Sequence, residues 1–412
     1  MQWSEYSNGQ RIKILRGRDV TQSQLAEMTG LSVVTIQKAE QDKALSLNTL
    51  LTIADALGAD TSVILGQQAP RRAMAQADRI TLRTLSQTVH DTAAGLLPEG
   101  VEEAGGADDL RSVIRACWER YWKGLYVEAG ALAAPLLQQA AMHLHGRPTG
   151  EQGEAWGLLA DSYRISAYVA NLMGARDLAY AAIGHAQAAA ERSADELQPA
   201  VVASGRSWIY LRDARLQDAL RLAEKAAVDV EPRFSTATVD QLTVYGSHIN
   251  FAAVVASRLK DKERAADYLS QSHAAGVRMG AEHRAYGTLF GPLTATTQAV
   301  GINVALGLTG KALTLIDSIK DVTGLTEAAR HRYAMDKAMT LADAGLWDRS
   351  LDTLEETLVQ APEWARHQAL PNVIVEKVGR ASTGRLRRVR DLIGAQTGIS
   401  HGFPPATAKS AL

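Results

Sequence analysis

The chain contains few side chains whose type and spacing could support catalysis. Residues Ala305–Ala312, ALGLTGKA, have the outline of a phosphate-binding loop, but alanine stands where the first glycine and the magnesium-binding hydroxyl belong. We therefore interpret this segment as a turn between two helices. His143 and His145 are two residues apart, so on a helix they point to different sides and make no metal pair. Because no H-E-x-x-H or G-x-S-x-G pattern occurs, the sequence predicts no enzyme, no metal site and no cofactor.

Composition limits the partners and the location. A length of 412 residues with 46% hydrophobic content suffices for several domains. The net charge of −1 excludes a polycation that coats nucleic acid or membrane by bulk charge. The single cysteine, Cys117, lies among aromatic residues and is predicted to be a buried core residue in a reducing, cytoplasmic protein. No secretion signal begins the chain, and runs such as Phe251–Ala256 are far shorter than the roughly 20 residues that span a bilayer, so no membrane partner is expected.

The elements that carry any function are predicted to be helices throughout. Alternating strand patterns are nearly absent, whereas alanine-rich segments with apolar residues at i, i+3, i+4 and i+7 recur. Glycine- and proline-rich breaks divide the chain into four predicted parts. These are a helical bundle at 8–67, a connecting segment at 68–107 with a helix at 79–97, a helical repeat domain at 108–400, and a flexible tail at 401–412.

The first part contains the signals of five short helices. Thr21 is placed to cap a helix over 22–29, and Gly30 supplies the left-handed residue of a tight turn. Ser32 is placed to cap the next helix, over 33–41, which turns Ile36 and Ala39 back onto its neighbour. Helices at about 9–18, 47–57 and 61–65 complete the bundle.

The strings TQSQLAEMTGLSVVTIQKAE and LNTLLTIADALGADTSVIL resemble the lambda-repressor-like (XRE) helix-turn-helix family. The resemblance implies that the third helix lies in the major groove of double-stranded operator DNA and reads base edges. It also implies that Gln22 and Thr35 contact phosphates or brace the reading side chains. The groove-facing set on this helix would be Ser32, Val33, Val34, Gln37 and Lys38. Apolar contact with thymine methyl groups is the natural role of Val33 and Val34.

Charge within the bundle is low for a DNA-binding domain. Residues 1–67 carry six basic and seven acidic side chains, so a monomer is expected to bind weakly because phosphate contacts normally dominate affinity. Two further features would compensate for this low positive charge. Arg71 and Arg72, with Arg79 and Arg83 after them, could follow the DNA backbone, and a homodimer would double the contacts on a palindromic site. The alternative is a helical module kept for protein contacts.

The later part is predicted to be a tetratricopeptide-like α-solenoid. Trp156, Leu159, Ala160 and Tyr163 fit the opening pattern of a tetratricopeptide helix. Small residues four before an apolar residue recur in later second helices, at Ala219, Ala265, Ala312 and Ser350. Together with FGPLTATTQAVGINVALG (290–307), the arrangement resembles actinobacterial XRE–tetratricopeptide regulators. Gram-positive peptide-responsive regulators share only the architecture. Both resemblances imply a dimeric transcription factor whose solenoid binds an effector or assembles the dimer.

A small-molecule or peptide effector would lie on the concave face, where a solenoid presents its first helices. Asparagine and arginine could bind a peptide backbone or a carboxylate there. Asn250 and Asn303 stand inside apolar runs, where an amide needs a partner, while Arg164 and Arg206 equally fit a solvated face. A competing function is a protein-partner hub that the helix-turn-helix only localises. The predicted effector-binding residues are Arg164, Arg206, Tyr210, Asn250, Gln298, Asn303 and Arg332.

Overall fold

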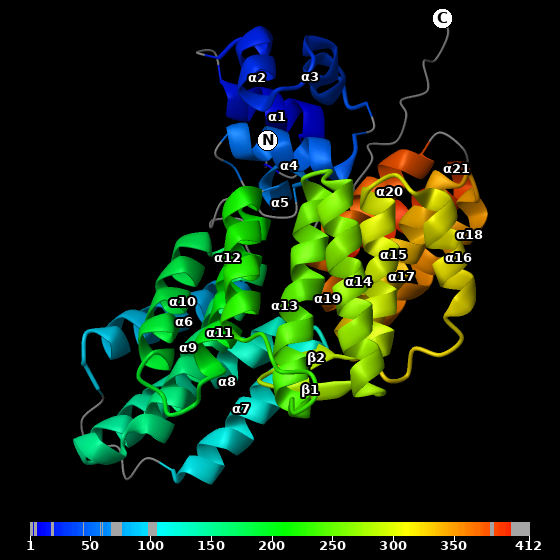
Figure 1. The fold of residues 1–412 in the computed structure, drawn as a ribbon. Coiled ribbons are helices and arrows are strands. Elements are labelled where there is room, and N and C mark those ends of the chain that lie inside the picture. Colours follow the sequence, from blue (N-terminus) through cyan, green and yellow to red (C-terminus); the bar gives the residue numbers. More distant parts are fainter. Residues whose placement is uncertain are drawn as a thin grey trace, which may run out of the picture.

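The computed structural model of the chain is almost entirely helical (Figure 1). It describes residues 3, 6–17, 20–43, 45–57, 59, 61–66, 76–97, 105–379 and 383–396. The all-α prediction is therefore confirmed. Arg71, Arg72 and the predicted tail at 401–412 lie outside the described residues.

Five short helices form the amino-terminal bundle at the top of Figure 1. Ile12, Leu25, Ile36 and Ile53 from four of the helices have no exposed surface and make its core. These are the inward positions that the helical period requires. The helices are α1 (Asn8–Arg16), α2 (Gln22–Thr29), α3 (Val33–Glu40), α4 (Leu47–Ala56) and α5 (Thr61–Ile64).

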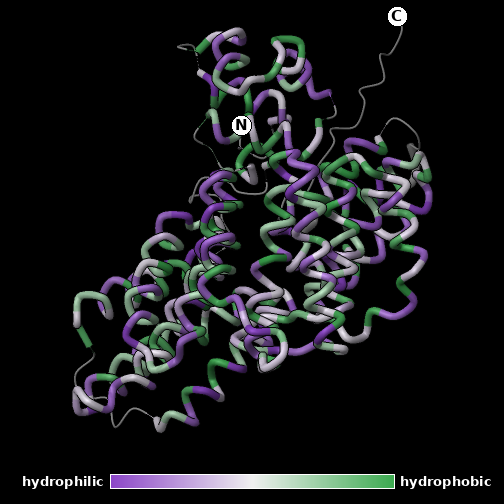
Figure 2. Tube along the Cα trace, viewed as in Figure 1, coloured by the Kyte–Doolittle hydropathy of each residue, from purple (hydrophilic) through white to green (hydrophobic). Residues whose placement is uncertain are grey.

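Six antiparallel hairpins follow in the described part of the chain, and each helix packs on the next. Green and purple residues alternate along these helices in Figure 2, as expected for helices with one buried face. A 3₁₀ turn, η3 (Thr149–Glu151), precedes the second hairpin. The hairpins are α7 (Ala107–Trp122) with α8 (Tyr126–His145), α9 (Gly153–Leu172) with α10 (Arg176–Ala190), α11 (Gln198–Arg212) with α12 (Leu216–Asp229), α13 (Val239–Arg258) with α14 (Lys262–Met279), α15 (Pro292–Ala305) with α16 (Thr309–Ser318), and α17 (Glu327–Asp343) with α18 (Trp347–Gln360).

All six hairpins use the same turn. One residue adopts a positive φ, between 58° and 80°, and the next N–H bonds to the carbonyl five residues back at 2.8–3.0 Å. This geometry is a Schellman turn, which satisfies carbonyls that the helix end leaves unpaired. The predicted interpretation of Ala305–Ala312 as a turn is confirmed, because Gly307 is one of these residues. The positive-φ residues are Gly124, Gly174, Ala214, Lys260, Gly307 and Gly345.

Five residues after each turn stands a small side chain with no exposed surface. A small residue is required because the two helices approach closely. Ser207 Oγ on α11 donates to the Ala219 carbonyl at 2.7 Å, and Ser350 Oγ on α18 donates to the Ala338 carbonyl at 2.7 Å. Four of these small residues were expected from the sequence, and two, Ala129 and Ala179, were not. The six residues are Ala129, Ala179, Ala219, Ala265, Ala312 and Ser350.

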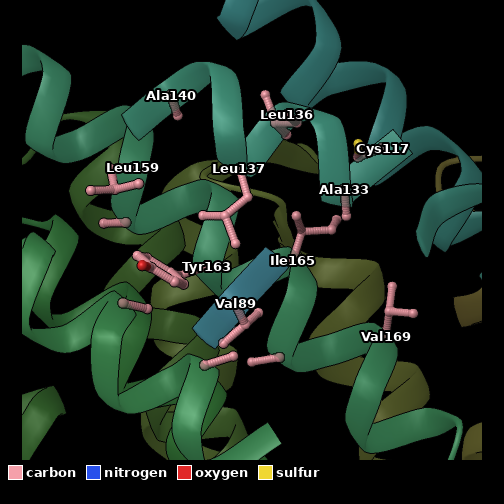
Figure 3. Packing of buried hydrophobic residues seen from close by; sticks show 14 of the residues in the cluster. Val89, Cys117, Ala133, Leu136, Leu137, Ala140, Leu159, Tyr163, Ile165 and Val169 are labelled. Carbon is pink, nitrogen blue, oxygen red and sulfur yellow. The ribbon is translucent and has the colours of Figure 1, made fainter. Parts of the chain in front are cut away.

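Helix α6 (Gln76–Ala93) is part of the hairpin array rather than a free connector. It was expected at 79–97, but begins and ends earlier. Val89 has no exposed surface and packs with Leu137 and Ile165 of α8 and α9 (Figure 3). Cys117 lies in the same core, as expected, and burial raises the pKa of its thiol to about 12. A thiol in this environment is inert.

A short antiparallel ribbon, β1 (His283–Ala285) with β2 (Thr288–Phe290), interrupts the helices before α15. No strand was predicted here from the sequence. Phe290 is completely buried against Gly246, where a Cβ atom would collide with the ring. At the ribbon's tip, the Tyr286 carbonyl accepts from Arg164 Nη2 at 2.6 Å. The ribbon is thereby fixed to α9.

The last three helices, α19 (Pro362–Arg366), α20 (Leu370–Val378) and α21 (Thr383–Gln396), follow the sixth hairpin. Helix α19 reaches back to the start of the array. Arg366 Nη2 lies 3.0 Å from Asp78 Oδ1 of α6, and Glu363 Oε1 accepts from the Val127 N–H of α8 at 3.2 Å. These contacts close the array on itself.

Two further properties concern membranes and metals. Among the described helices, none combines the length and the apolar character that a membrane span needs. Within the described residues, no group of three or more His, Cys, Asp or Glu side chains is arranged to hold a metal ion.

The close approach within each hairpin can be tested at Ala265. Replacing Ala265 with Leu is expected to destabilise the chain by about 1–3 kcal/mol, because extra methylenes have no space where α13 and α14 meet. The neighbouring Ala266 is exposed, so Ala266→Leu is the matched control and should change stability by less than about 0.5 kcal/mol. Urea midpoints measure both variants. Equal midpoints would contradict the packing argument.

Candidate nucleic-acid interface

The helix-turn-helix forms as its caps predict. Thr21 Oγ1 accepts from the Gln24 N–H at 3.2 Å, and the Gln24 side chain accepts from the Thr21 N–H at 2.8 Å, a complete capping box. Gly30 has the left-handed conformation, with φ 65° and ψ 12°. Ser32 Oγ accepts from the Thr35 N–H at 3.1 Å and begins α3. These local predictions are confirmed.

Helix α3 has one buried and one exposed face. Ile36 and Ala39 are buried against α1 and α2. The opposite face is open, and Val34 is 58% exposed although it is apolar. An exposed apolar side chain beside polar ones suits contact with a thymine methyl group. The five exposed residues are those expected in the groove, namely Ser32, Val33, Val34, Gln37 and Lys38.

The two residues expected to contact phosphates or brace are bonded within the bundle. Gln22 Nε2 donates to Glu40 Oε2 at 2.7 Å, and the Thr35 hydroxyl lies 2.8 Å from the Ser32 hydroxyl. Both side chains therefore make contacts within the bundle, and their expected role, phosphate contact or bracing of the reading side chains, stays a prediction.

Glu40 joins α3 to both preceding helices. Its carboxylate pairs with Arg16 Nε of α1 at 2.5 Å and accepts from Gln22 of α2. Burial alone would raise the pKa of Glu40, but the hydrogen bonds from Arg16 and Gln22 and the charge of Arg16 outweigh it, so the pKa lies below its usual 4.5. Glu40 was not among the site residues predicted from the sequence. It is the last residue of the string TQSQLAEMTGLSVVTIQKAE, which resembles the family, and that position was the available signal.

Arg11 has a structural role that was not predicted from the sequence. The side chain is buried, with Nε donating to the Trp3 carbonyl at 3.0 Å and Nη1 to the Ile64 carbonyl at 3.1 Å. It ties α1 to α5. Burial lowers its pKa to about 10, against the attraction of Asp42 and Glu376. Two of the six basic residues in 1–67, Arg11 and Arg16, are therefore committed to internal contacts.

The bundle meets the hairpin array through its opposite side. Figure 1 shows α2 and α3 far from the array and α4 and α5 close to it. Asn48 of α4 donates to the Arg258 carbonyl of α13, and Asn8 donates to Glu376 of α20. A hydrophobic core runs without interruption from the bundle into α17–α21. The exposed face of α3 is thus held outward.

Two of the seven residues expected in an effector site share a pocket. Gln298 and Arg332 line a pocket of about 330 Å³ between the bundle and the array. The remaining residues are elsewhere. The buried amide of Asn250 accepts from Ser272 at 3.2 Å, and Asn303 donates to the Ala299 carbonyl one turn back in its own helix at 2.7 Å.

The other three expected residues lie against neighbours in the array. Arg164 is buried, bonds to Asp161 at 2.7 Å and to the ribbon tip, and lies over the Trp118 ring at 4.5 Å. Tyr210 lies under the Arg215 guanidinium at 4.1 Å, and Arg206 approaches Gly184 of α10. A larger pocket of about 750 Å³ beside Trp118, Trp122 and the ribbon contains none of the seven predicted residues.

Comparison with known proteins identifies the amino-terminal bundle. Residues 12–65 match the Cro/C1-type HTH DNA-binding domain. No curated protein matches the chain. Among solved structures, BtubC (BKLC) from P. vanneervenii is similar over 68% of this chain and 96% of that chain, with 15% identity and a TM-score of 0.38. The chain thus carries an XRE-like helix-turn-helix of a DNA-binding regulator, as the sequence resemblance implied. The tetratricopeptide and actinobacterial resemblances stay predictions.

The Glu40 contacts predict a pH-dependent stability of the helix-turn-helix. Since the folded pKa is depressed, the stabilisation is complete above the unfolded value of 4.5 and is lost as the pH falls through the lower folded pKa. Glu40→Gln removes the charge and should cost about 1.5–3 kcal/mol near neutral pH. Hydrogen exchange of α1 and α3 amides measures the loss. Glu27→Gln, at an exposed position of α2, is the control. Identical exchange in both variants would disprove the role of Glu40.

Proposed function

We propose that this chain is a sequence-specific, homodimeric transcriptional regulator of the cytoplasm whose hairpin array senses an effector. The observation that carries the proposal is the open face of α3, which a braced bundle presents away from the array. The matched Cro/C1-type domain supports DNA as the partner. An α-helix with such a face fits the major groove.

The exposed side chains of α3 supply base-reading chemistry. The Gln37 amide can donate to and accept from one adenine edge, and the Lys38 ammonium can donate to guanine acceptors or to a phosphate. Val33 and Val34 offer methyl groups to thymine. Ser32 can donate to or accept from either kind of group. The set combines specific hydrogen bonds with apolar contacts, as direct readout requires.

Dimerisation follows from the low charge of the domain. Two of its basic side chains are used internally, so one copy offers few phosphate contacts. Two copies on one duplex double both phosphate and base contacts. In this family's geometry the half-sites lie about 34 Å apart. Arg71 and Arg72 remain proposed phosphate ligands.

The reading role of α3 is tested on an operator selected from random duplex DNA with the full chain. Gln37→Ala is expected to cost about 1–3 kcal/mol and relax specificity at one base pair. Lys38→Ala, if it contacts phosphate, weakens binding evenly across sequences and lowers the salt slope by about 1. Fluorescence anisotropy against salt concentration separates the two effects.

Matched controls for these variants lie on the array. Gln139→Ala on α8 and Lys311→Ala on α16 remove the same side chains from exposed positions away from the bundle. Both should bind the operator as the parent chain does. If the α3 variants bind equally well, α3 does not read the DNA.

The homodimer predicts two chains on each full operator. Sedimentation of the chain with full-site DNA should give a complex of two chains, and a duplex with one half-site removed should lose affinity by at least tenfold at equal salt. Because about five extra base pairs rotate one half-site by roughly half a helical turn relative to the other, inserting them between the half-sites should also weaken binding. One chain per full site would disprove the dimeric mode.

A further inference from the structure

The pocket between the bundle and the array is walled by both. Leu47 and Leu51 of α4 and Thr61 of α5 form one side. Trp208 of α11, Phe251 of α13 and Leu370 of α20 contribute to the other. Its volume of about 330 Å³ is at the small end of ligand sites, which suits a compact molecule.

Three arginines converge on this pocket, namely Arg212, Arg258 and Arg332. Arg332 Nε lies 3.2 Å from Asp336 Oδ2. Among the described residues, the guanidinium groups of Arg212 and Arg258 have no hydrogen-bond or ion-pair partner, and Arg212 Nε is inaccessible to solvent as well. Both residues are half-buried and line the pocket, and the Arg212 guanidinium lies 5.7 Å from the centroid of the Trp208 ring. Buried cations are normally paired, so this arrangement is incomplete.

The groups facing the arginines do not balance their charge. The adjacent imidazole of His367 is neutral at physiological pH, because burial and then the charges of Arg366 and Arg212 lower its pKa to about 3. Burial, reinforced by Arg332 and opposed by Asp336, lowers the pKa of Arg258 to about 10. Asp336 is one carboxylate against three guanidinium groups. The pocket therefore lacks a group that carries negative charge and hydrogen-bond acceptors.

We infer that this pocket binds a small organic anion, with a carboxylate or phosphate group between Arg212 and Arg258 and an apolar body against Trp208, Phe251 and Leu51. Guanidinium groups bind both kinds of oxyanion through paired N–H donors. The aromatic and leucine side chains supply the apolar surface that a bare inorganic ion would leave unused. The inference rests on the proposed function in one respect, that the bound anion is the effector.

The position of the pocket couples its occupant to the DNA-binding bundle. Asn48, between the two lining leucines of α4, donates to the backbone carbonyl of Arg258. A ligand held by the Arg258 side chain therefore acts on the residue that anchors α4. A ligand that contacts both walls favours one placement of the bundle, and by linkage it changes operator affinity.

The binding test uses the full chain with phenyl phosphate, benzoate and neutral benzyl alcohol as probes in calorimetry. Either anion, or both, is expected to bind, and benzyl alcohol at least tenfold more weakly. The two anions distinguish a phosphate ligand from a carboxylate ligand. Arg212→Gln and Arg258→Gln should each weaken anion binding at least tenfold, whereas Arg349→Gln, at an exposed position of α18, should not. Equal binding of the alcohol, or no anion binding, overturns the inference.

A second measurement needs no variant. Phenylglyoxal modifies accessible arginines, and peptide mass spectrometry reports each site. Saturating anion should slow modification of Arg258, whose side chain is only partly buried, at least tenfold and leave exposed Arg349 unchanged. Unaltered modification of both arginines overturns the inference even if the glutamine variants fail to fold.

Neither binding test contains DNA, so its result is independent of the proposed function. Operator affinity is then measured with and without the bound anion. A change of at least threefold in the parent chain, absent in Arg258→Gln, supports the effector role. An unchanged affinity overturns that role. If the anion binds and no operator can be selected, the proposed function fails while the pocket stands.

Discussion

The contact of α19 with the first helices of the array determines the shape on which the rest of the molecule depends. Its two polar contacts join residues that are 236 and 288 positions apart along the chain. Gly124, in the first hairpin turn, leaves no room for a Cβ atom beside Trp364, so the approach is close. In an open repeat array each unit contacts only its neighbours and the curvature is free to vary. Here the long-range contact fixes it.

The closed array also forms the surface on which the DNA-binding bundle packs. Trp364 and Leu370 belong to the same hydrophobic core as Ile12 and Leu50 of the bundle. The orientation of α3 is thus a property of the whole chain, held by packing and by the Asn8 and Asn48 hydrogen bonds. Because α4 and α5 face the array, α3 is directed outward.

What the sequence could predict was local. Thr21, Gly30 and Ser32 were recognisable because each cap is satisfied within three residues. The small residues of four second helices followed from spacing alone. The ribbon was missed because two three-residue strands show no alternation pattern. The predicted effector-binding residues lie in different places because the helical period indicates which side chains face inward but not which neighbouring helix they contact. Asn303, for example, is satisfied one turn back in its own helix.

Two pairs of partly or fully buried arginines illustrate what the fold does with charge. Arg16 meets Glu40 and Arg11 meets backbone carbonyls, so inside the bundle each buried cation has acceptors. At the junction, Arg212 and Arg258 face a pocket instead. Unpaired charge there costs free energy that the closed array and the shared core offset. A ligand can shift the bundle only through a difference in affinity between two placements. Charges placed where two domains meet provide such a difference, because moving either wall changes the distance to the anion.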